Sequence, residues 1–380
     1  MSNKTERLTV KQGCSFHAEA KQAVAELSAQ ILQEDMRVVV FFCASTFNLD
    51  DLGAELKQAF DCPVIGCTSS GEITSEFGYQ EGSLIGISLS SKELIVHPFF
   101  IHPLDQFDHP QSEALLHQLR QQLAMSAGLD AKQMFGMLLI DGLSMLEEQV
   151  VATLYSMLGN IPVLGGSAGD DLSFVKTKIY NDGQFVDNAA MFALFETTLP
   201  FKVFRSQHFE PTDIRLVITE ADPATRTVTE INGEPAAEEF ARLVGLELQA
   251  LTPQMFATFP VMLRVGGEYF VRSIQKANPD GSLTFYCAID TGLVLTIAKG
   301  NALLDNIQQN LDLLQKELPN YKIIIGCDCI LRRVELAENG WLCQASAILK
   351  DAKFMGFSTY GEQFNGIHVN QTLTGVAIGE

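Results

Sequence analysis

The chain has 380 residues, of which 47% are hydrophobic and 19% are charged, and its formal net charge is −20. This composition is typical of a globular protein with room for two cores, and it excludes a disordered chain. The negative charge argues against nucleic acid as a partner, because the phosphates would be repelled and the basic doublet Arg332-Arg333 stands beside apolar residues. No apolar run approaches the roughly 18 residues of a membrane span, and the N-terminus lacks a signal-peptide core. We therefore expect a cytoplasmic protein without membrane insertion.

The first half of the chain is predicted to alternate strands with helices. Apolar residues at helical spacing mark the helices, and short apolar runs bounded by turn residues mark the strands. The predicted helices are 19–33, 52–60, 111–127 and 147–158. The predicted strands are 38–42, 63–65, 82–89, 93–101, 137–140, 162–164, 174–181 and 184–196. A turn at 197–200 then ends a first domain, residues 1–199.

The second half, residues 200–380, is predicted to form a second α/β domain. Its predicted helices are 236–243 and 301–318. Its predicted strands are 216–219, 227–231, 261–265, 268–274, 282–289, 323–325, 353–355 and 373–378. The predicted fold class is therefore α/β, with two α/β domains built from recurring strand-helix-strand-loop units and mixed sheets. No long linker separates the halves, so we expect them to share an interface.

Three glycine-bounded loops, 66–72, 165–170 and 356–362, recur at the ends of predicted buried strands. A strand and a helical stretch come before each of these strands, so we expect the loops to meet at one end of the sheets, where α/β proteins bind ligands. The candidate ligand contacts in these loops are Cys67, Thr68, Ser69, Ser70, Glu72, Ser167, Ser358, Thr359 and Glu362. The alternative is that these side chains satisfy local backbone groups of strand-end turns.

Standard enzyme signatures are missing from the sequence. It has no P-loop lysine motif and no H-E-x-x-H, so we do not predict an enzyme. Catalysis at Cys67 or Ser70 in the first loop stays open as an alternative. Cys327 and Cys329 form a close pair, but alternate residues of a strand point to opposite faces, so burial is favoured over zinc binding.

Two of the seven histidines stand apart from those in solvated segments. His208 lies between aromatic residues at the junction of the halves, and His368 follows the third loop. A neutral imidazole in apolar surroundings is a good iron ligand, although a core histidine with satisfied hydrogen bonds is the commoner state. The 25 phenylalanines would suit a haem pocket and equally well fill ordinary cores.

These motifs resemble the landmarks of the FIST family of two-domain sensory proteins. Residues 66–73 and 165–170 resemble those of its N-terminal domain. Residues 231–237, 271–273 and 361–362 resemble those of its C-terminal domain. The resemblance covers essentially the whole chain.

Four longer strings, 206–213, 272–285, 327–333 and 356–379, resemble the bacterial branch of the family called NosP, the nitric-oxide-sensing proteins. That resemblance implies a cytoplasmic protein that binds nitric oxide at a haem b held by a histidine. It also implies control of a partner histidine kinase and, through the kinase, of cyclic-di-GMP signalling and biofilm behaviour. His208 and His368 lie inside these strings and are the candidate axial ligands of the haem iron.

Two other functions compete with the haem sensor. One is a sensory module without haem that binds a small polar ligand, such as an amino acid, between the Ser/Thr loops. The other is an enzyme that uses the Ser/Cys-rich loops. The sequence leaves the assembly state open, a homo-oligomer included.

Overall fold

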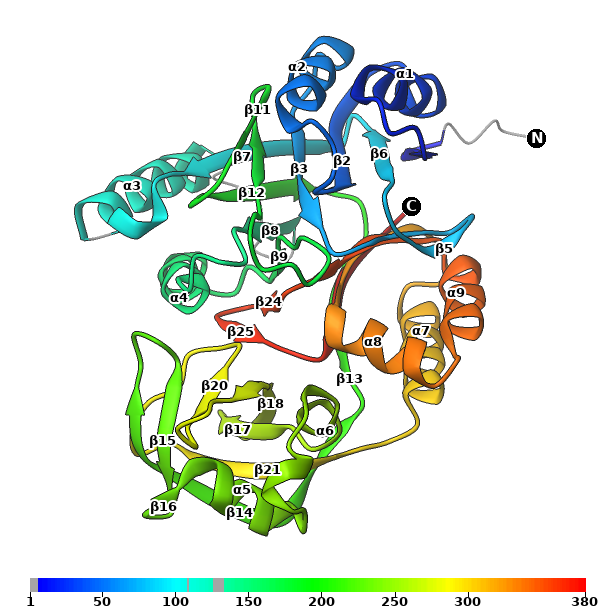
Figure 1. The fold of residues 1–380 in the computed structure, drawn as a ribbon. Helices are drawn as coiled ribbons and strands as arrows, with labels where there is room; N and C mark the ends of the chain where they lie inside the picture. The colour runs from blue at the N-terminus through cyan, green and yellow to red at the C-terminus, as the bar shows by residue number, and fades with distance from the viewer. Residues whose placement is uncertain (1–5, 108, 126–132) are drawn as a thin grey trace.

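The computed structural model of the chain describes residues 6–107, 109–125 and 133–380 (Figure 1). Three six-stranded sheets lie together, and an eight-stranded sheet lies beneath them in this view. We call the three six-stranded sheets and their helices the body. We call residues 209–300 the inserted domain, because they form the eight-stranded sheet and interrupt the chain between two elements of the body.

The first sheet of the body comes mainly from the first predicted unit. Its strands, in order across the sheet, are β1 (Thr9–Ser15), β6 (Leu84–Ser90), β2 (Met36–Ala44), β3 (Val64–Ser69), β10 (Ile179–Asn181) and β11 (Gln184–Val186). Helices α1 (Ala20–Ile31) and α2 (Leu49–Ala59) cover one face of it. α1 buries Ala20, Val24, Leu27 and Ile31, the stripe that its spacing predicts, and Asn48 caps α2 by accepting a hydrogen bond from the Asp51 amide.

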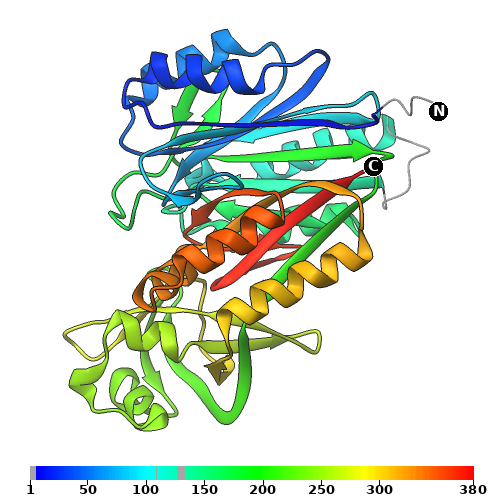
Figure 2. The ribbon, with the colours of Figure 1, turned by 90° about the vertical axis from the view of Figure 1, so that its right-hand side faces the viewer.

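The other two sheets of the body repeat this plan. The second contains β25 (Ile367–Val369), β24 (Glu362–Phe364), β9 (Val163–Ser167), β8 (Met134–Ile140), β12 (Ala190–Thr197) and β7 (Leu94–Ile101), with α3 (His109–Met125) and α4 (Glu147–Leu158). The third contains β13 (Phe201–Gln207), β26 (Thr372–Gly379), β22 (Tyr321–Cys329), β23 (Phe354–Thr359), β4 (Glu72–Thr74) and β5 (Gly78–Gln80). Helices α7 (Leu303–Glu317), α8 (Ile330–Glu338) and α9 (Leu342–Asp351) lie along the third sheet (Figure 2).

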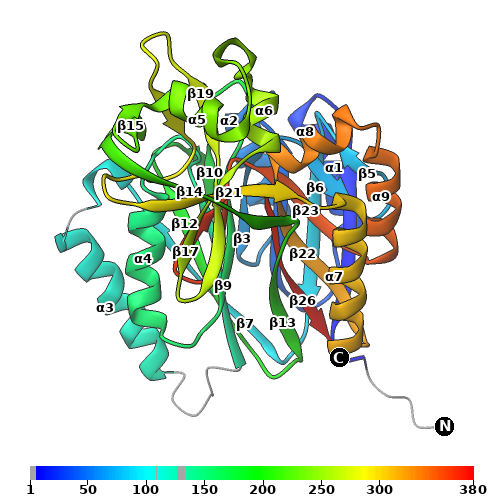
Figure 3. The same cartoon turned by 90° about the horizontal axis from the view of Figure 1, so that it is seen from below.

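The inserted domain is an antiparallel sheet in which the first strand, β14, pairs with the last, β21. Its strand order is β18 (Glu268–Arg272), β17 (Val261–Val265), β21 (Val294–Gly300), β14 (Phe209–Asp222), β15 (Thr227–Ile231), β20 (Leu283–Phe285) and β19 (Ile274–Ala277), with β16 (Glu234–Pro235) paired to β15. Helices α5 (Ala236–Val244) and α6 (Pro253–Thr258) belong to this domain (Figure 3). Its core is separate from that of the body and includes Ile218, Phe240 and Phe256.

The three units of the body exchange hairpins in a cycle. The hairpin β4–β5 of the first unit pairs with β23, β10–β11 of the second pairs with β3, and β24–β25 of the third pairs with β9. Each hairpin comes after one of the three glycine-bounded loops, so every loop crosses from one sheet to the next. Residues 321–380 therefore share sheets and core with the first half of the chain.

The predicted fold class is confirmed, because the strand-helix-strand units form mixed sheets with parallel central pairs. Stacked aromatic rings join the units in the core, with the Phe42 and Phe357 centroids 4.2 Å apart. The strand expected over 174–181 is short, and only β10 forms, because 171–178 is a loop. The boundary predicted at residue 199 lies between β12 and β13. Among the described residues, no helix has the length and apolar character needed to cross a bilayer.

Candidate functional site

The three glycine-bounded loops meet and hydrogen-bond to one another through their backbones. The Ser70 amide donates to the Ser358 carbonyl at 3.0 Å, and the Ser358 amide donates to Gly71 at 2.7 Å. The Gly169 amide donates to Thr68 at 3.1 Å. The Ser167 amide of the second loop donates to the Gly361 carbonyl of the third loop at 2.8 Å. The prediction that these segments gather at one end of the sheets is confirmed. Their first residues, 66–69, 165–167 and 356–359, were expected in loops but continue strands β3, β9 and β23.

The carboxylates that end the first and third loops are buried and hold their own hairpins. Glu72 accepts hydrogen bonds from the Ser69 hydroxyl and from the amide and hydroxyl of Ser83, at 3.1 and 2.6 Å. Glu362 accepts from the Thr359 hydroxyl at 2.5 Å and from the amide and hydroxyl of Thr372, at 3.1 and 2.7 Å. Burial raises the pKa of Glu72 to about 7 and that of Glu362 to about 8.

The predicted loop contacts are all buried inside the body. Cys67, Thr68, Ser69, Ser70, Glu72, Ser167, Ser358, Thr359 and Glu362 are each at most 1% exposed. Burial also raises the pKa of the Cys67 thiol well above its usual value, so the thiolate that a nucleophile requires is disfavoured. Ser69, Glu72, Thr359 and Glu362 bond within their own units, as the alternative interpretation from the sequence expects. Thr68, Ser70 and Ser167 instead bond to segments of the other units. The Ser358 hydroxyl is an exception and has no hydrogen-bond partner among the described residues.

The two candidate haem ligands lie in different surroundings. His208 is buried at the start of the inserted domain, with its Nε2 atom 3.0 Å from Glu335 and its Nδ1 atom 3.4 Å from Arg332. The Nδ1 atom of His368 lies 3.2 Å from Gln363, whereas its Nε2 atom has no partner among the described residues. Burial lowers the pKa of His368 to about 4, so this imidazole is neutral at physiological pH.

A cluster of four charged side chains joins the inserted domain to the body. The Arg226 Nη2 atom lies 2.7 Å from Glu147 and 2.8 Å from Glu148, the first two residues of α4. The Arg272 Nη1 atom lies 3.6 Å from Glu148 and donates to the His368 carbonyl at 3.2 Å. We call Glu147, Glu148, Arg226 and Arg272 the junction cluster. Burial raises the pKa of Glu147, and the Arg226 guanidinium beside it opposes that shift.

Two adjoining cavities lie at this junction. The larger, the outer chamber, has a volume of 530 Å³, within the range of small-molecule sites. The body lines it with Leu172, Phe174, Leu331 and Val334, and the inserted domain with Gln254, Ala257, Gln275, Lys276 and Tyr286. The inner chamber, of 210 Å³, shares Phe174, Gln275 and Tyr286 with it and reaches Arg226. We call the two chambers together the groove.

The loop at 170–176 places Phe174 between the two chambers. Asp170 accepts hydrogen bonds from the three amides of residues 174–176, at 2.7 to 2.9 Å, and from the Tyr360 hydroxyl. The Phe174 ring stacks on Tyr360, with centroids 4.7 Å apart. Asp171, Leu172 and Phe174 have φ values of 56°, 61° and 52°, which cost energy in residues other than glycine. The carboxylate therefore holds a strained loop in place over the groove.

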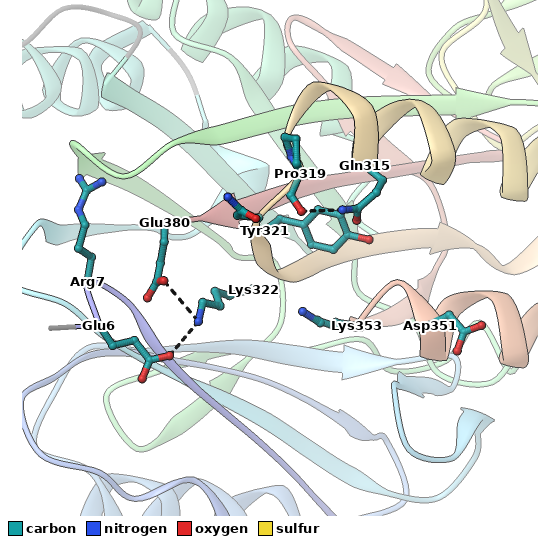
Figure 4. Close-up of a pocket in the computed structure, with 10 residues that line it drawn as sticks. Glu6, Arg7, Gln315, Pro319, Tyr321, Lys322, Asp351, Lys353 and Glu380 are labelled. Carbon is teal, nitrogen blue, oxygen red and sulfur yellow. Dashed lines mark hydrogen bonds and ion pairs between the residues drawn. The ribbon is translucent and has the colours of Figure 1, made fainter. Parts of the chain in front are cut away.

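A cavity of 790 Å³ lies elsewhere, beside both termini of the described chain (Figure 4). Its lining is largely polar, and Lys322 pairs there with Glu6 and Glu380 at 2.8 and 3.4 Å. Tyr321 and Lys353 also line it, so it lies at the amino ends of β22 and β23. Ligands of α/β proteins bind at the carboxyl ends of the parallel strands. The groove is therefore the better candidate for the functional site.

Sequence reasoning missed the residues that form the groove. Leu331 and Val334 lie on α8, directly after β22, and Arg226 lies in the turn before β15. The acidic pair Glu147-Glu148 at a helix start was the one available signal, because acidic residues there usually face solvent or a cation. Pairing with an arginine 78 residues away cannot be read from local periodicity.

The structure therefore has two parts, the body and the inserted domain, with a cavity of ligand size between them. The FIST N domain model matches residues 37–234 and the FIST C domain model matches residues 236–365, so the chain belongs to the FIST family. It is also similar to an uncharacterized protein of Methanocaldococcus jannaschii, MJ1623, with 23% identity over 229 residues. That match covers 56% of this chain and 40% of the relative, so it spans about two fifths of the relative's length. The FIST domains indicate a sensory signalling module for small ligands.

Proposed function

We propose that the chain is a sensor that binds its small ligand in the groove between the body and the inserted domain. One observation carries this proposal: the outer chamber is lined from both sides, by Leu331 and Val334 of the body and by Ala257 and Tyr286 of the inserted domain. A ligand there contacts both parts, so its binding free energy depends on their relative position. That dependence is what allows a ligand to shift a conformational equilibrium.

The junction cluster supplies the contacts that a shift of this kind would change. Arg226 and Arg272 belong to the inserted domain, and Glu147 and Glu148 belong to the body. Moving the inserted domain would separate buried charges, which costs free energy unless a ligand compensates. The proposed output is the one that the resemblance implies, control of a partner histidine kinase and of cyclic-di-GMP signalling. Amino acids are among the small polar ligands to test first.

The test compares ligand binding in a variant with a filled groove and in a matched control. Ala257→Trp places an indole in the outer chamber, and Ala25→Trp places one on the exposed face of α1. Amino acids and other small metabolites are screened by thermal shift with the unsubstituted chain, and each hit is measured by calorimetry with both variants. We expect Ala257→Trp to abolish binding and Ala25→Trp to retain it. Hits that bind both variants equally would refute the groove as the site.

A haem-based sensor of nitric oxide is the second candidate function, and the unpartnered Nε2 atom of His368 favours it. Neutral imidazole with a free nitrogen is one of the donors that bind haem iron in proteins. The space around both histidines does not fit a porphyrin. A side chain on Gly361 would lie 2.7 Å from that Nε2 atom, so backbone closely faces it, and Glu335 and Arg332 occupy the nitrogens of His208. Neither imidazole lines the groove.

Visible spectroscopy tests the second candidate independently of the groove. The purified chain is titrated with haemin, with and without nitric oxide, and compared with His208→Ala and His368→Ala. A Soret band that is lost in one of these variants would support haem as the cofactor. A band that both variants retain would show that neither His208 nor His368 is the axial ligand. No band in the unsubstituted chain would show that it does not bind haem.

A further inference from the structure

We infer that the ligand of the outer chamber is an amphipathic anion: an apolar body that carries one carboxylate or similar acidic group. This inference rests on the proposed function and adds the chemical class of the ligand. Two observations carry it: the apolar character of the chamber wall, and one cation at its edge, Lys276, that has no ion-pair partner among the described residues.

Most of the chamber wall presents hydrocarbon to the cavity. Leu172 and Phe174 reach it from the strained loop, Leu331 and Val334 from α8, and Tyr286 from the inserted domain. Leu172 is 40% exposed and Phe174 is 37% exposed, although large apolar side chains favour burial. The loop that carries them is held by Asp170 in a backbone conformation that costs energy. An apolar ligand would cover this surface and gain the free energy of burying it.

Lys276 supplies the charge. It is the only charged residue among the described residues that line the outer chamber. No described carboxylate forms an ion pair with it, whereas Arg226 and Arg272 are paired with Glu147 and Glu148. Gln254 and Gln275, also in the lining, add amide donors. A chamber with one free cation, amide donors and no carboxylate fits an anionic head group and disfavours a cation.

A further cavity beside the outer chamber differs from it in the charges of its lining. It has a volume of 440 Å³ and contains an exposed lysine, Lys299, but it is also lined by Glu335 and Glu338. An anion entering that cavity would meet two carboxylates. Lys299 is therefore a matched control for Lys276. Both are lysines in the lining of a junction cavity, but the carboxylates beside Lys299 would repel an anion. The further cavity shares Gln254 and Ala257 with the outer chamber, so Val334→Trp, which fills the outer chamber alone, is measured beside Ala257→Trp.

The experiment measures probe binding to the purified full chain by fluorescence. The anionic probe is 1-anilinonaphthalene-8-sulfonate, the neutral probe is N-phenyl-1-naphthylamine, and dodecanoate is the competitor. We expect saturable binding of the sulfonate, displacement by dodecanoate, and loss of binding in Ala257→Trp and in Val334→Trp. Lys276→Gln should weaken binding of both anions about three- to fivefold, the size of one exposed ion pair. Lys276→Arg and Lys299→Gln should retain it.

The outcomes separate the ligand class from the proposed site. If Lys276→Gln leaves anion binding unchanged while the neutral probe binds and Ala257→Trp abolishes that binding, the groove stands and the anionic class is wrong. If neither probe binds, or if Ala257→Trp leaves binding of both probes unchanged, the groove is not the site, and the inference fails together with the proposed function.

Discussion

The junction cluster gives the most demanding prediction, because its arginine is buried between two carboxylates. The Arg226 side chain is 6% exposed, and its Nη1 atom also donates to the Tyr286 carbonyl at 2.6 Å. Arg226→Met keeps most of the apolar stem and removes the charge, which leaves Glu147 and Glu148 without their main cation. Removing one partner of a buried ion pair costs about 3–5 kcal/mol, because the remaining charge stays desolvated.

Urea unfolding, followed by the fluorescence of Trp341, the single tryptophan, measures this loss. Lys57→Met is the matched control, because Lys57 pairs with Asp182 on the surface, where the two side chains are 55% and 77% exposed and a pair contributes at most about 1 kcal/mol. Adding Glu147→Gln to Arg226→Met should recover part of the loss, since it removes one unpaired carboxylate. A loss below about 1 kcal/mol for Arg226→Met, or strictly additive effects in the double variant, would refute the reasoning.

Three further predictions concern the loops of the body and the groove. Burial raises the folded-state pKa of Glu362 to about 8, above its ordinary value of 4.5, so its contribution to stability is present below pH 4.5 and is lost as pH rises through 8. We expect the unfolding free energy of the unsubstituted chain to fall between pH 5 and 9, and this fall to be flatter in Glu362→Gln. An unchanged slope in the variant would contradict this. Gly361→Ala should destabilise the chain by about 1–3 kcal/mol in thermal unfolding, because the new Cβ atom would overlap the His368 ring; a variant as stable as the unsubstituted chain would show that the ring can move aside. Phe174→Ala removes the ring that lines both chambers and stacks on Tyr360, so the groove should admit larger ligands. We expect the variant to bind bulky probes more tightly than the unsubstituted chain does. Equal affinity of the variant for large and small probes would count against this.

The local features of the body could be predicted from the sequence. The apolar stripe of α1 at Ala20, Val24, Leu27 and Ile31 follows from helical spacing alone. The recurrence of the three loops after buried strands predicts that they lie at corresponding strand ends. Their contacts with one another depend on the exchanged hairpins, because the strands that carry them belong to three different sheets.

The exchange of hairpins and the groove could not be predicted in the same way. The pairing of β24 with β9 joins residues about 200 positions apart, and neither strand carries a local pattern that names its partner. The sequence predicts Glu362 as a ligand contact, because a carboxylate after a hydroxyl loop can bind a ligand as well as accept hydrogen bonds from the turn itself. Only the structure shows that Thr372 and Thr359 occupy its oxygens. The lining residue Val334 lies on α8, where the sequence predicts a helical stretch between two strands but gives no bounds for it and no sign that it faces another domain.

Hydrogen–deuterium exchange of the full chain, with and without bound 1-anilinonaphthalene-8-sulfonate, tests most directly whether the groove holds the ligand. The account predicts slower exchange in the segments that line the outer chamber, 171–175, 254–257, 275–286 and 331–334. It also predicts a change at the start of α4, where the junction cluster joins the two parts. Protection confined to the cavity at the termini, around residues 319–322 and 351–353, or to the buried loops of the body, would contradict it.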